Sequence, residues 1–378
     1  MSNGGGPSGI MVPAMPSADA PSSSRTQDLL VEVLRLAGEP RSPRHERYLR
    51  EILLNVVRLV RDDTSLGDLK IINTALKEMR TAFRVFAPYR HVRKVSIFGS
   101  ARTAEGTPGY RQAKEFAARI CHEGFMVLTG AGGGIMRACQ EGSGRARSFG
   151  VNIRLPWEQR ANEFIDRDPK LVTFKYFFTR KLIFIKEADA IVLFPGGFGT
   201  HDEGFESLTL VQTGKSRPLP IIFLDAPGGT YWTTWQRYVE DHLLEAGLIS
   251  AADLGLFRVT DRIEDAIDEI RTFYRVYHSS RYVGDRLVIR LSATPRPALV
   301  AELNATFGDL LRSGTIELGE ALPHELEDGD FVHLPRLLLR FDRTHFGRLR
   351  ALIDRLNGAT SAELAALPPP PAAEAGGG

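Results

Sequence analysis

The sequence has little cysteine, little net charge and no long apolar run, and each shortage excludes a class of protein. Cys121 and Cys139 are the only cysteines in 378 residues, which argues against a disulfide-stabilised scaffold and is typical of a reducing compartment. The 48 Lys and Arg residues nearly balance 46 Asp and Glu, for a formal charge of +2, so the chain lacks the electrostatic footprint of a protein that binds nucleic acid or an anionic membrane. No apolar run approaches the ~18 residues that a membrane-spanning helix needs. We therefore expect a cytoplasmic protein that acts on a small molecule.

Composition divides the chain into five stretches. At 378 residues and 43% hydrophobic, it is longer than one core supports, because single cores stop growing near ~250 to 300 residues. We predict a disordered tail at 1–25, which is rich in Gly, Pro and Ser and lacks the charged and apolar regions of a signal peptide. A second tail at 359–378 contains four consecutive prolines. Between the tails we predict a helical extension at 26–90, a large domain at 91–280 and a small α+β module at 281–358.

The large domain alternates short apolar runs with helical stretches. The runs predict strands at 95–98, 125–128, 149–153, 190–194, 221–224 and 256–259. The stretches between and after them predict helices near 110–122, 134–145, 177–188, 201–214, 231–246 and 263–279. Continuous apolar runs are typical of parallel strands that are buried on both faces. The order therefore indicates an α/β protein with a doubly wound, Rossmann-like parallel sheet.

The two flanking segments show other periodicities. In the helical extension, apolar residues such as Leu29, Val33 and Leu36 recur at three- and four-residue steps, and Pro88 ends the pattern because proline resists the helix interior. The module after residue 280 predicts a strand at 286–291, a helix at 297–312, extended pieces near 315–318 and 336–341, and a helix at 344–356.

Three predicted turns at the carboxyl ends of strands are rich in glycine. They are Gly99-Ser100-Ala101-Arg102, Thr129-Gly130-Ala131-Gly132-Gly133-Gly134-Ile135-Met136 and Pro195-Gly196-Gly197-Phe198-Gly199-Thr200. Ligands of doubly wound sheets bind beyond these strand ends. Glycine lets the backbone approach a ligand, and the following helix attracts phosphate with its N-terminal dipole. A single such turn could simply be tight, but three at one sheet edge favour a phosphate site. The candidate binding residues are Gly99, Ser100, Gly130, Gly132, Gly134, Gly196, Gly197, Gly199 and Thr200.

The common nucleotide motifs fail at single positions. A G-x-G-x-x-G motif beginning at Gly130 would need glycine in place of Ile135, and one beginning at Gly132 would need it in place of Arg137. Gly214-Lys215-Ser216 looks like the end of a P-loop, but Thr209 stands where the first glycine belongs. The histidines, His122 and His201 among them, are isolated, so packing or surface roles are favoured over metal ligation. We expect neither a metal nor a nicotinamide or ATP cofactor.

The third turn carries a longer motif that resembles the LOG ("Lonely guy") family. The family pattern is P-G-G-x-G-T-x-x-E with an upstream Arg-Lys pair, and here it runs from Pro195 to Glu203 with Arg180-Lys181 before it. The resemblance covers about residues 93–270 and includes Gly99-Ser100-Ala101-Arg102 and Val151-Asn152-Ile153-Arg154-Leu155-Pro156. Phe177 stands where the plant-like branch has Met, and Ala131 and Gly133 depart from the usual second turn.

The resemblance implies a function and an assembly. Family members hydrolyse the N-glycosidic bond of nucleoside 5'-monophosphates, AMP-like or of the cytokinin riboside type, and release a free base and ribose 5-phosphate without a cofactor. It implies that Arg180 and Glu203 are catalytic and that Lys181 helps to position the anion. It also implies a homodimer or a higher even-numbered oligomer whose subunits complete each other's sites.

Structural interpretations compete at the same residues. Thr200-x-x-Glu203 at a helix start is also a capping box, in which the carboxylate bonds a backbone amide, and spacing alone does not separate cap from catalyst. A charged Arg180-Lys181 pair at a helix start is usually a solvated face, although cations are mildly unfavourable there. Aromatic residues nearby could line a base pocket or fill the core; they are Phe174, Tyr176, Phe177 and Phe178.

Two other functions stay open. A noncatalytic nucleotide sensor would use the same turns, with the module after residue 280 as its output. A decarboxylase, a label that similar proteins have carried, would need a lysine that holds pyridoxal phosphate and a partner for the ring nitrogen, and no such motif is visible.

Overall fold

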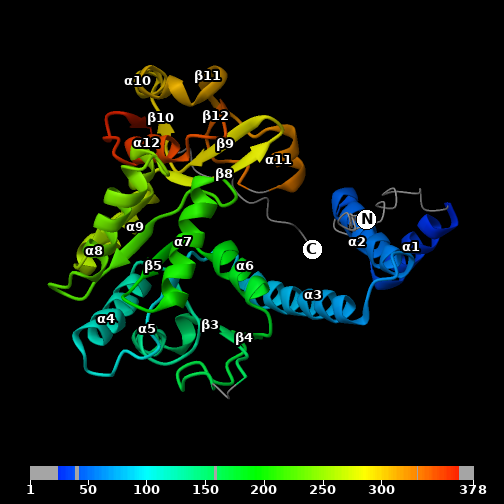
Figure 1. Ribbon diagram of the computed structural model, residues 1–378. Coiled ribbons are helices and arrows are strands. Elements are labelled where there is room, and N and C mark those ends of the chain that lie inside the picture. The colour runs from blue at the N-terminus through cyan, green and yellow to red at the C-terminus, as the bar shows by residue number, and fades with distance from the viewer. Residues whose placement is uncertain (1–23, 39–41, 157–159, 330, 366–378) are drawn as a thin grey trace, which may run out of the picture. The chain divides into compact units, whose positions relative to one another are not determined.

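The computed structural model describes residues 24–38, 42–156, 160–329 and 331–365 (Figure 1). The chain forms two compact units, residues 1–73 and 74–378, and each is described by itself. Most of both predicted tails, residues 1–23 and 366–378, lies outside the described residues. Among the described residues, no helix combines the length and apolar character needed to cross a membrane.

The first unit is helical, as predicted. It contains α1 (Ser24–Ala37), α2 (Pro43–Arg61) and the first residues of α3 (Leu66–Phe86). The start of α2 shows why a helix begins there: the Ser42 hydroxyl accepts a hydrogen bond from the His45 amide, and Pro43 occupies the first turn. No residue of α2, all of which is described, is buried within the structure.

The second unit is built on a seven-stranded parallel sheet in the order β4-β3-β2-β1-β5-β6-β7. Its strands are β1 (Lys94–Phe98), β2 (Met126–Thr129), β3 (Ser148–Ile153), β4 (Leu171–Phe174), β5 (Ala190–Leu193), β6 (Ile221–Leu224) and β7 (Phe257–Thr260). The inner strands β1, β2, β3, β5 and β6 are buried along their whole length, which explains their uninterrupted apolar sequences. The predicted Rossmann-like fold and its six predicted strands are confirmed.

The seventh strand, β4, was missed by the sequence analysis. It pairs only with β3, at the edge of the sheet, and Thr173 is exposed between buried Val172 and Phe174. A four-residue edge strand with one exposed residue lacks the continuous apolar run that marks its neighbours.

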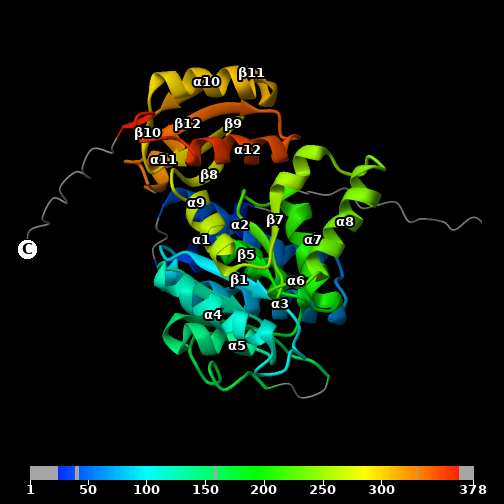
Figure 2. The same ribbon diagram turned by 90° about the vertical axis from the view of Figure 1, so that its left-hand side faces the viewer.

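Helices cover both faces of the sheet (Figures 1 and 2). On one face lie α4 (Pro108–His122), α5 (Ile135–Ser143) and α9 (Ile263–Phe273), which share a core with β1 and β2. On the other lie the end of α3, α6 (Phe177–Glu187), α7 (Phe198–Gln212) and α8 (Tyr231–Tyr238), which continues as a π-helical segment, Val239–Leu244. The 3₁₀ segments η1 (Ala87–Tyr89), η2 (Arg145–Arg147) and η4 (Ala251–Leu256) join these elements.

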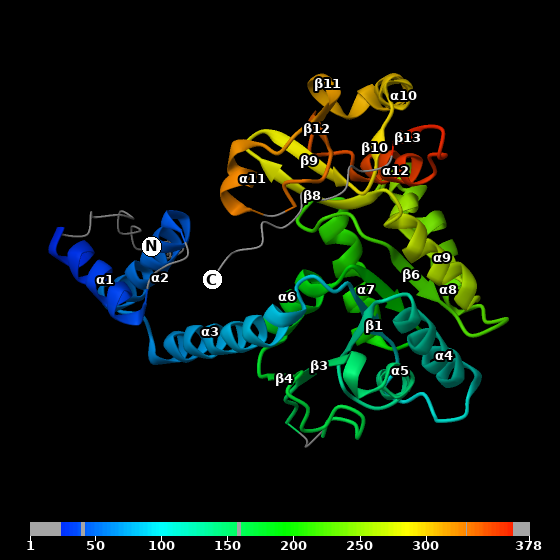
Figure 3. The ribbon, with the colours of Figure 1, turned by 180° about the vertical axis from the view of Figure 1, so that it is seen from behind.

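The C-terminal residues form a smaller antiparallel sheet in the order β11-β12-β9-β8 (Figure 3). Its elements are β8 (Tyr277–Val283), β9 (Arg286–Leu291), α10 (Pro297–Phe307), η5 (Gly308–Leu310), β11 (Leu311–Gly319), α11 (Pro323–Asp328), β12 (Arg336–Phe341) and α12 (Phe346–Asn357). Its apolar core is continuous with the face of the large sheet that carries α4 and α9. Strand β8 was not predicted, because it is only partly buried after Tyr277 and contains four consecutive polar residues, His278-Ser279-Ser280-Arg281.

One predicted boundary is wrong. We predicted disorder from residue 359, but Ala359 is buried and β13 (Leu364–Ala365) pairs with β10 (Thr294–Pro295) in a two-stranded ladder. The proline run dominated the composition of this stretch, while the pairing depends on a distant partner that composition does not reveal.

Candidate functional site

A cleft opens where the strand order of the large sheet reverses. From β1 the chain passes through α4 to β2 on one side, and from β5 it passes through α7 to β6 on the other. The loops after β1 and β5 therefore diverge, as they do at the ligand sites of doubly wound sheets. The cleft has a volume of about 790 Å³, and its lining is Phe98, Gly99, Ser100, Ala101, Arg102, Gly130, Met136, Phe177, Arg180, Gly196, Gly197, Phe198, Gly199, Thr200, His201, Asp202, Glu203 and Tyr231.

The three glycine-rich turns meet at this sheet edge, as predicted. The Ser100 amide donates a hydrogen bond to the Pro195 carbonyl (3.1 Å), and the Ile135 amide donates to the Ser100 carbonyl (3.0 Å). The turn after β1 is thus bonded to both of the others. A Cβ atom on Gly196 would lie 2.1 Å from Thr200 Oγ1 and 3.0 Å from the Ser100 nitrogen, so this close assembly requires glycine there.

The start of α7 offers a phosphate site. The helix begins at Phe198, directly after Gly197, and the Thr200 amide bonds back to the Gly197 carbonyl (2.9 Å). The Phe198 and Gly199 amides precede it at the positive end of the helix dipole, and both residues line the cleft. Thr200 lies in the same first turn, and its side chain packs over Gly196. Phe198 is 96% exposed at the rim.

The capping-box interpretation of Thr200 and Glu203 is wrong. Because the cap position of α7 is Gly197 and no side chain bonds there, Thr200 is already inside the helix and Glu203 lies one turn further on. The Thr-x-x-Glu pattern is compatible with a helix that begins after Thr200 and with one that begins after Gly197. The packing of Thr200 over Gly196 favours the second.

Glu203 is a buried carboxylate with an unsatisfied oxygen. The residue is 5% exposed, and its Oε2 has no hydrogen-bond partner among the described residues. Burial raises the pKa of Glu203 to about 7, and the positive charges of Lys181 and Arg180 oppose the rise. A buried polar atom without a partner costs free energy, and strongly perturbed acids in clefts are characteristic of functional sites.

Arg180 lies in the first turns of α6 and reaches the same cleft. Its Nε donates to the Val151 carbonyl (2.9 Å), and its guanidinium lies 5.0 Å from the centre of the Phe184 ring. Burial lowers the pKa of Arg180 while Glu203 raises it. A Cβ on Gly130 would lie 2.6 Å from Arg180 Nη2. The absence of a side chain at Gly130 therefore leaves space for the Arg180 guanidinium.

Three predicted binding residues do not line the cleft. Lys181 Nζ is paired with Asp202 Oδ2 (2.8 Å) and Glu206 Oε2 (2.6 Å). The Gly132 carbonyl accepts from Asn162 Nδ2 (2.9 Å). Gly134 has a φ of 58°, and a Cβ there would lie 2.2 Å from the Ser100 carbonyl oxygen, so it serves the packing of turn against turn. Among the aromatic candidates, Phe177 lines the cleft and Phe174 is in the core.

Tyr231 and His201 form one wall of the cleft, and neither was predicted as a site residue. The Tyr231 hydroxyl donates to the Gly196 carbonyl and lies 2.7 Å from His201 Nε2. His201 packs against Trp232 with ring centres 5.4 Å apart, and burial lowers its pKa. The signal was available: Pro227-Gly228-Gly229 is a fourth glycine-rich turn after a strand, and Tyr231 begins the next helix.

Comparisons with known proteins agree with this geometry. A family model described as "Possible lysine decarboxylase" matches residues 133–270. The cytokinin riboside 5'-monophosphate phosphoribohydrolase of Mycobacterium tuberculosis (strain ATCC 25618 / H37Rv) is 30% identical over 159 residues, which cover 41% of this chain and 81% of that protein. The fold and the cleft define a Rossmann-like protein with a glycine-lined site at the switch point of its sheet. The chain belongs to the LOG family.

Similar folds occur among solved structures. The molybdenum cofactor binding protein of Rippkaea orientalis has a TM-score of 0.35 and 17% identity, covering 48% of this chain and 96% of that one. The molybdenum cofactor carrier protein of Chlamydomonas reinhardtii has a TM-score of 0.34 and 19% identity, with the same two coverages.

Proposed function

We propose that this protein hydrolyses the N-glycosidic bond of a nucleoside 5'-monophosphate, AMP-like or of the cytokinin riboside type, to a free base and ribose 5-phosphate. The observation that carries the proposal is Glu203, whose partnerless buried oxygen lies in a cleft with Arg180 and the start of α7. The activity printed in the name of the Mycobacterium tuberculosis relative supports the same reaction.

Each part of the cleft has a role in this reaction. The first amides of α7 and the Thr200 hydroxyl bind the 5'-phosphate. The Arg180 guanidinium, held by Val151 and Phe184, presents its outer nitrogens to ribose or phosphate oxygens. Phe177 and Phe198 lie at the rim with 53% and 96% of their surface exposed, where an aromatic base could stack on them.

Glu203 acts on the reacting carbon. As the C1′–N bond breaks, its electron pair leaves with the base nitrogen and the ribose acquires oxocarbenium character, which a carboxylate stabilises. A water oxygen then bonds to C1′, Glu203 accepts the water proton, and the departing base takes up a proton. The sum is the addition of one water molecule, and no cofactor enters the balance. With a pKa of about 7, Glu203 can hold and release a proton near neutral pH.

The residues of the cleft do not fit a pyridoxal phosphate decarboxylase. That chemistry needs a lysine amine that can form a Schiff base. None of the described residues lining the cleft is a lysine, and the ammonium of Lys181 is engaged by two carboxylates.

The decisive experiment separates an enzyme from a nucleotide sensor. The protein is incubated with a panel of nucleoside monophosphates that includes AMP, and the free base is measured by chromatography. Hydrolysis predicts equal amounts of base and ribose 5-phosphate. A sensor would bind a nucleotide, detected by calorimetry, and would release no base over hours.

We also propose that the protein works as a homodimer or a higher even-numbered oligomer. Phe177, Phe178 and Leu182 on α6 are 53%, 56% and 47% exposed, and an apolar patch of this kind is typical of a protein interface. Phe177 also lines the cleft, so a partner on this face would complete the site. Light scattering at micromolar concentration tests this proposal, and an active monomer would contradict it.

A further inference from the structure

The position of Arg180 depends on what fixes the first turn of α6. Arg180 is the fourth residue of this helix, and the cap residue Tyr176 makes no side-chain cap hydrogen bond within the described structure. A helix start without a cap leaves amide groups in need of acceptors. The turn therefore needs contacts from elsewhere in the protein if it is to hold one position.

Glu78 of α3 supplies two such contacts, one on each side of the cap residue. Its Oε1 accepts a hydrogen bond from the Lys175 amide (2.6 Å), and its Oε2 accepts one from the Thr179 hydroxyl (2.6 Å). The residue is 9% exposed and belongs to the part of α3 that lies in the same compact unit as α6. A carboxylate from another helix thus ties the residue just before the α6 cap position to the third residue of the helix, and its charge lies at the favourable end of the α6 dipole.

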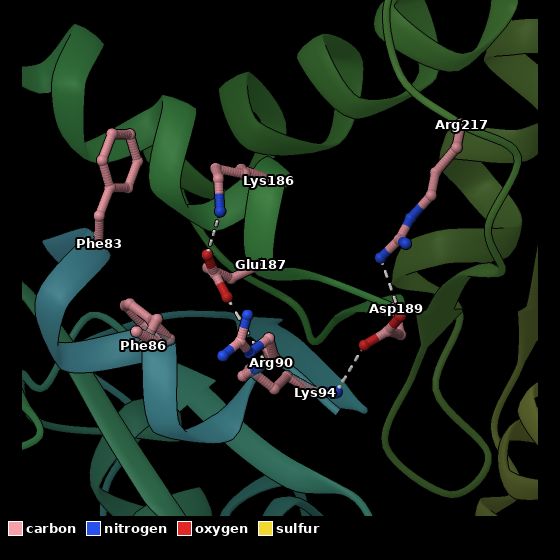
Figure 4. A pocket seen from close by; sticks show the side chains of 9 residues that line it. Phe83, Phe86, Arg90, Lys94, Lys186, Glu187, Asp189 and Arg217 are labelled. Carbon is pink, nitrogen blue, oxygen red and sulfur yellow. Dashed lines mark hydrogen bonds and ion pairs between the residues drawn. The ribbon is translucent and has the colours of Figure 1, made fainter. Parts of the chain in front are cut away.

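The other end of α6 is anchored separately (Figure 4). Glu187, its last residue, pairs with Lys94 of β1 (3.5 Å), and both side chains are buried. Next to it, Asp189 accepts a hydrogen bond from the Lys94 amide (2.9 Å) and pairs with Arg217 (2.8 Å). These contacts fix the end of α6 to the sheet but lie two turns away from Arg180. They do not determine the orientation of the first turn.

We infer that Glu78 is a positioning residue that holds the first turn of α6 and, through it, the Arg180 guanidinium in the cleft. The inference rests on the proposed function and deepens it. It makes α3, which lies outside residues 133–270 matched by the family model, a part of the catalytic unit. A shift of about 1 Å in a catalytic group can cost on the order of 100-fold in rate, so a residue that fixes the start of this helix has consequences beyond stability.

Three variants separate positioning from stability. Glu78→Ala removes both acceptors, whereas Glu78→Gln keeps an oxygen for the Lys175 amide and an amide group that can bond Thr179. Phe86→Leu is the matched control, because it weakens α3 at its other end by removing the stack of Phe86 on Phe149 (4.5 Å) and leaves the bonds of Glu78 to Lys175 and Thr179 intact. Melting temperature, kcat and KM for AMP are measured for each.

We expect Glu78→Ala to lower kcat at least 10-fold and Glu78→Gln to keep kcat within about 3-fold of the unmodified protein. Phe86→Leu should lower the melting temperature but leave kcat unchanged when it is measured at a temperature well below the melting temperature. A double-mutant cycle with Arg180→Ala tests whether Glu78 acts through Arg180. The effect of Glu78→Ala on kcat should shrink to less than 3-fold once the Arg180 side chain is absent. An unchanged kcat in Glu78→Ala, or a full effect in the Arg180→Ala background, overturns the inference.

Failure of the proposed function gives a different result. If the unmodified protein binds AMP without releasing adenine, the hydrolase proposal falls while the positioning inference is still tested. The same cycle is then run on the AMP dissociation constant from calorimetry. Weakened binding in Glu78→Ala that depends on Arg180 supports the inference, and additive effects overturn it.

Discussion

The two ends of the large sheet bury charge in different ways. At the amino end, a pocket of about 290 Å³ is lined by Lys94, Glu187, Asp189 and Arg217 among others, and these four form ion pairs (Figure 4). At the carboxyl end, Glu203 keeps a buried oxygen that has no hydrogen-bond partner in the part of the chain that the structure describes. Buried charges with partners contribute to a fixed structure, whereas one left without a partner is available to a substrate. The comparison predicts that changes at the amino end act on stability and changes at the carboxyl end act on turnover.

The largest expected effect is on stability, at the amino end. Lys94 is 3% exposed, and its ammonium donates to the Tyr89 and Val92 carbonyls in addition to its pairing with Glu187. Removing one partner of a buried pair costs ~3 to 5 kcal/mol. Because Lys186 still reaches Glu187, we expect Lys94→Met to lower the free energy of unfolding by about 3 kcal/mol, measured by urea denaturation, with kcat unchanged in the folded protein.

Lys186→Met is the control for this prediction. It breaks a pair to the same carboxylate, but the lysine is half exposed, so the loss should stay below about 1 kcal/mol. Equal losses in the two variants would contradict the importance of burial at this end.

Glu203→Gln should act in the opposite way. The change keeps the shape of the side chain and removes its charge, so turnover should fall ~100-fold or more, a barrier increase of about 2.7 kcal/mol. Stability should not fall, because no capping box is lost. Glu206→Gln, one turn along α7 at the surface pair with Lys181, is the matched control and should retain most of its turnover. Full turnover in Glu203→Gln would remove Glu203 from the reaction.

Thr200→Val sharpens the comparison within the carboxyl end. The substitution is close to isosteric and removes only the hydroxyl that we assign to the phosphate, so KM for AMP should rise about tenfold, or ~1.4 kcal/mol. The melting temperature should stay the same because Thr200 is not the cap of α7. Thr209→Val is the control, since its hydroxyl bonds the Phe205 carbonyl on the same helix away from the cleft. A falling melting temperature with constant KM would restore a structural role for Thr200.

The sequence predicted the parts of this molecule that carry local signals. Buried parallel strands and glycine turns such as Gly196-Gly197 appear as continuous patterns, and the structure confirmed them. Edge strands such as β4 and β8 are short or contain several polar residues, so they lack the continuous apolar run that marks the buried strands. The predicted start of α7 lies about one helical turn too late, because the Thr-x-x-Glu pattern fits two helix starts. Only the contact between Thr200 and Gly196 distinguishes between them. Glu78 has no local signal at all, since its partner Thr179 is 101 residues away.

The smallest expected effect at neutral pH comes from the titration of Glu203. It changes both turnover and stability, which the other predictions separate. Burial raises the pKa of Glu203 to about 7 in the folded protein from its usual value of 4.5. The reaction uses the ionised form and this pKa is that of the protein without substrate, so kcat/KM at pH 7 should be about half of its plateau and about a tenth of it at pH 6. Stability should move the other way. Between pH 4.5 and 7 the folded state binds more protons at this site than the unfolded state, so the contribution of Glu203 to stability is present at low pH and is lost as the pH rises through 7. Rate profiles and urea denaturation measured over this range check both trends. In Glu203→Gln, the part of each pH dependence that comes from Glu203 should disappear. A rate that falls as the pH rises from 6 to 8 would show that the protonated acid is the active form and would reverse the assignment of Glu203 as the base.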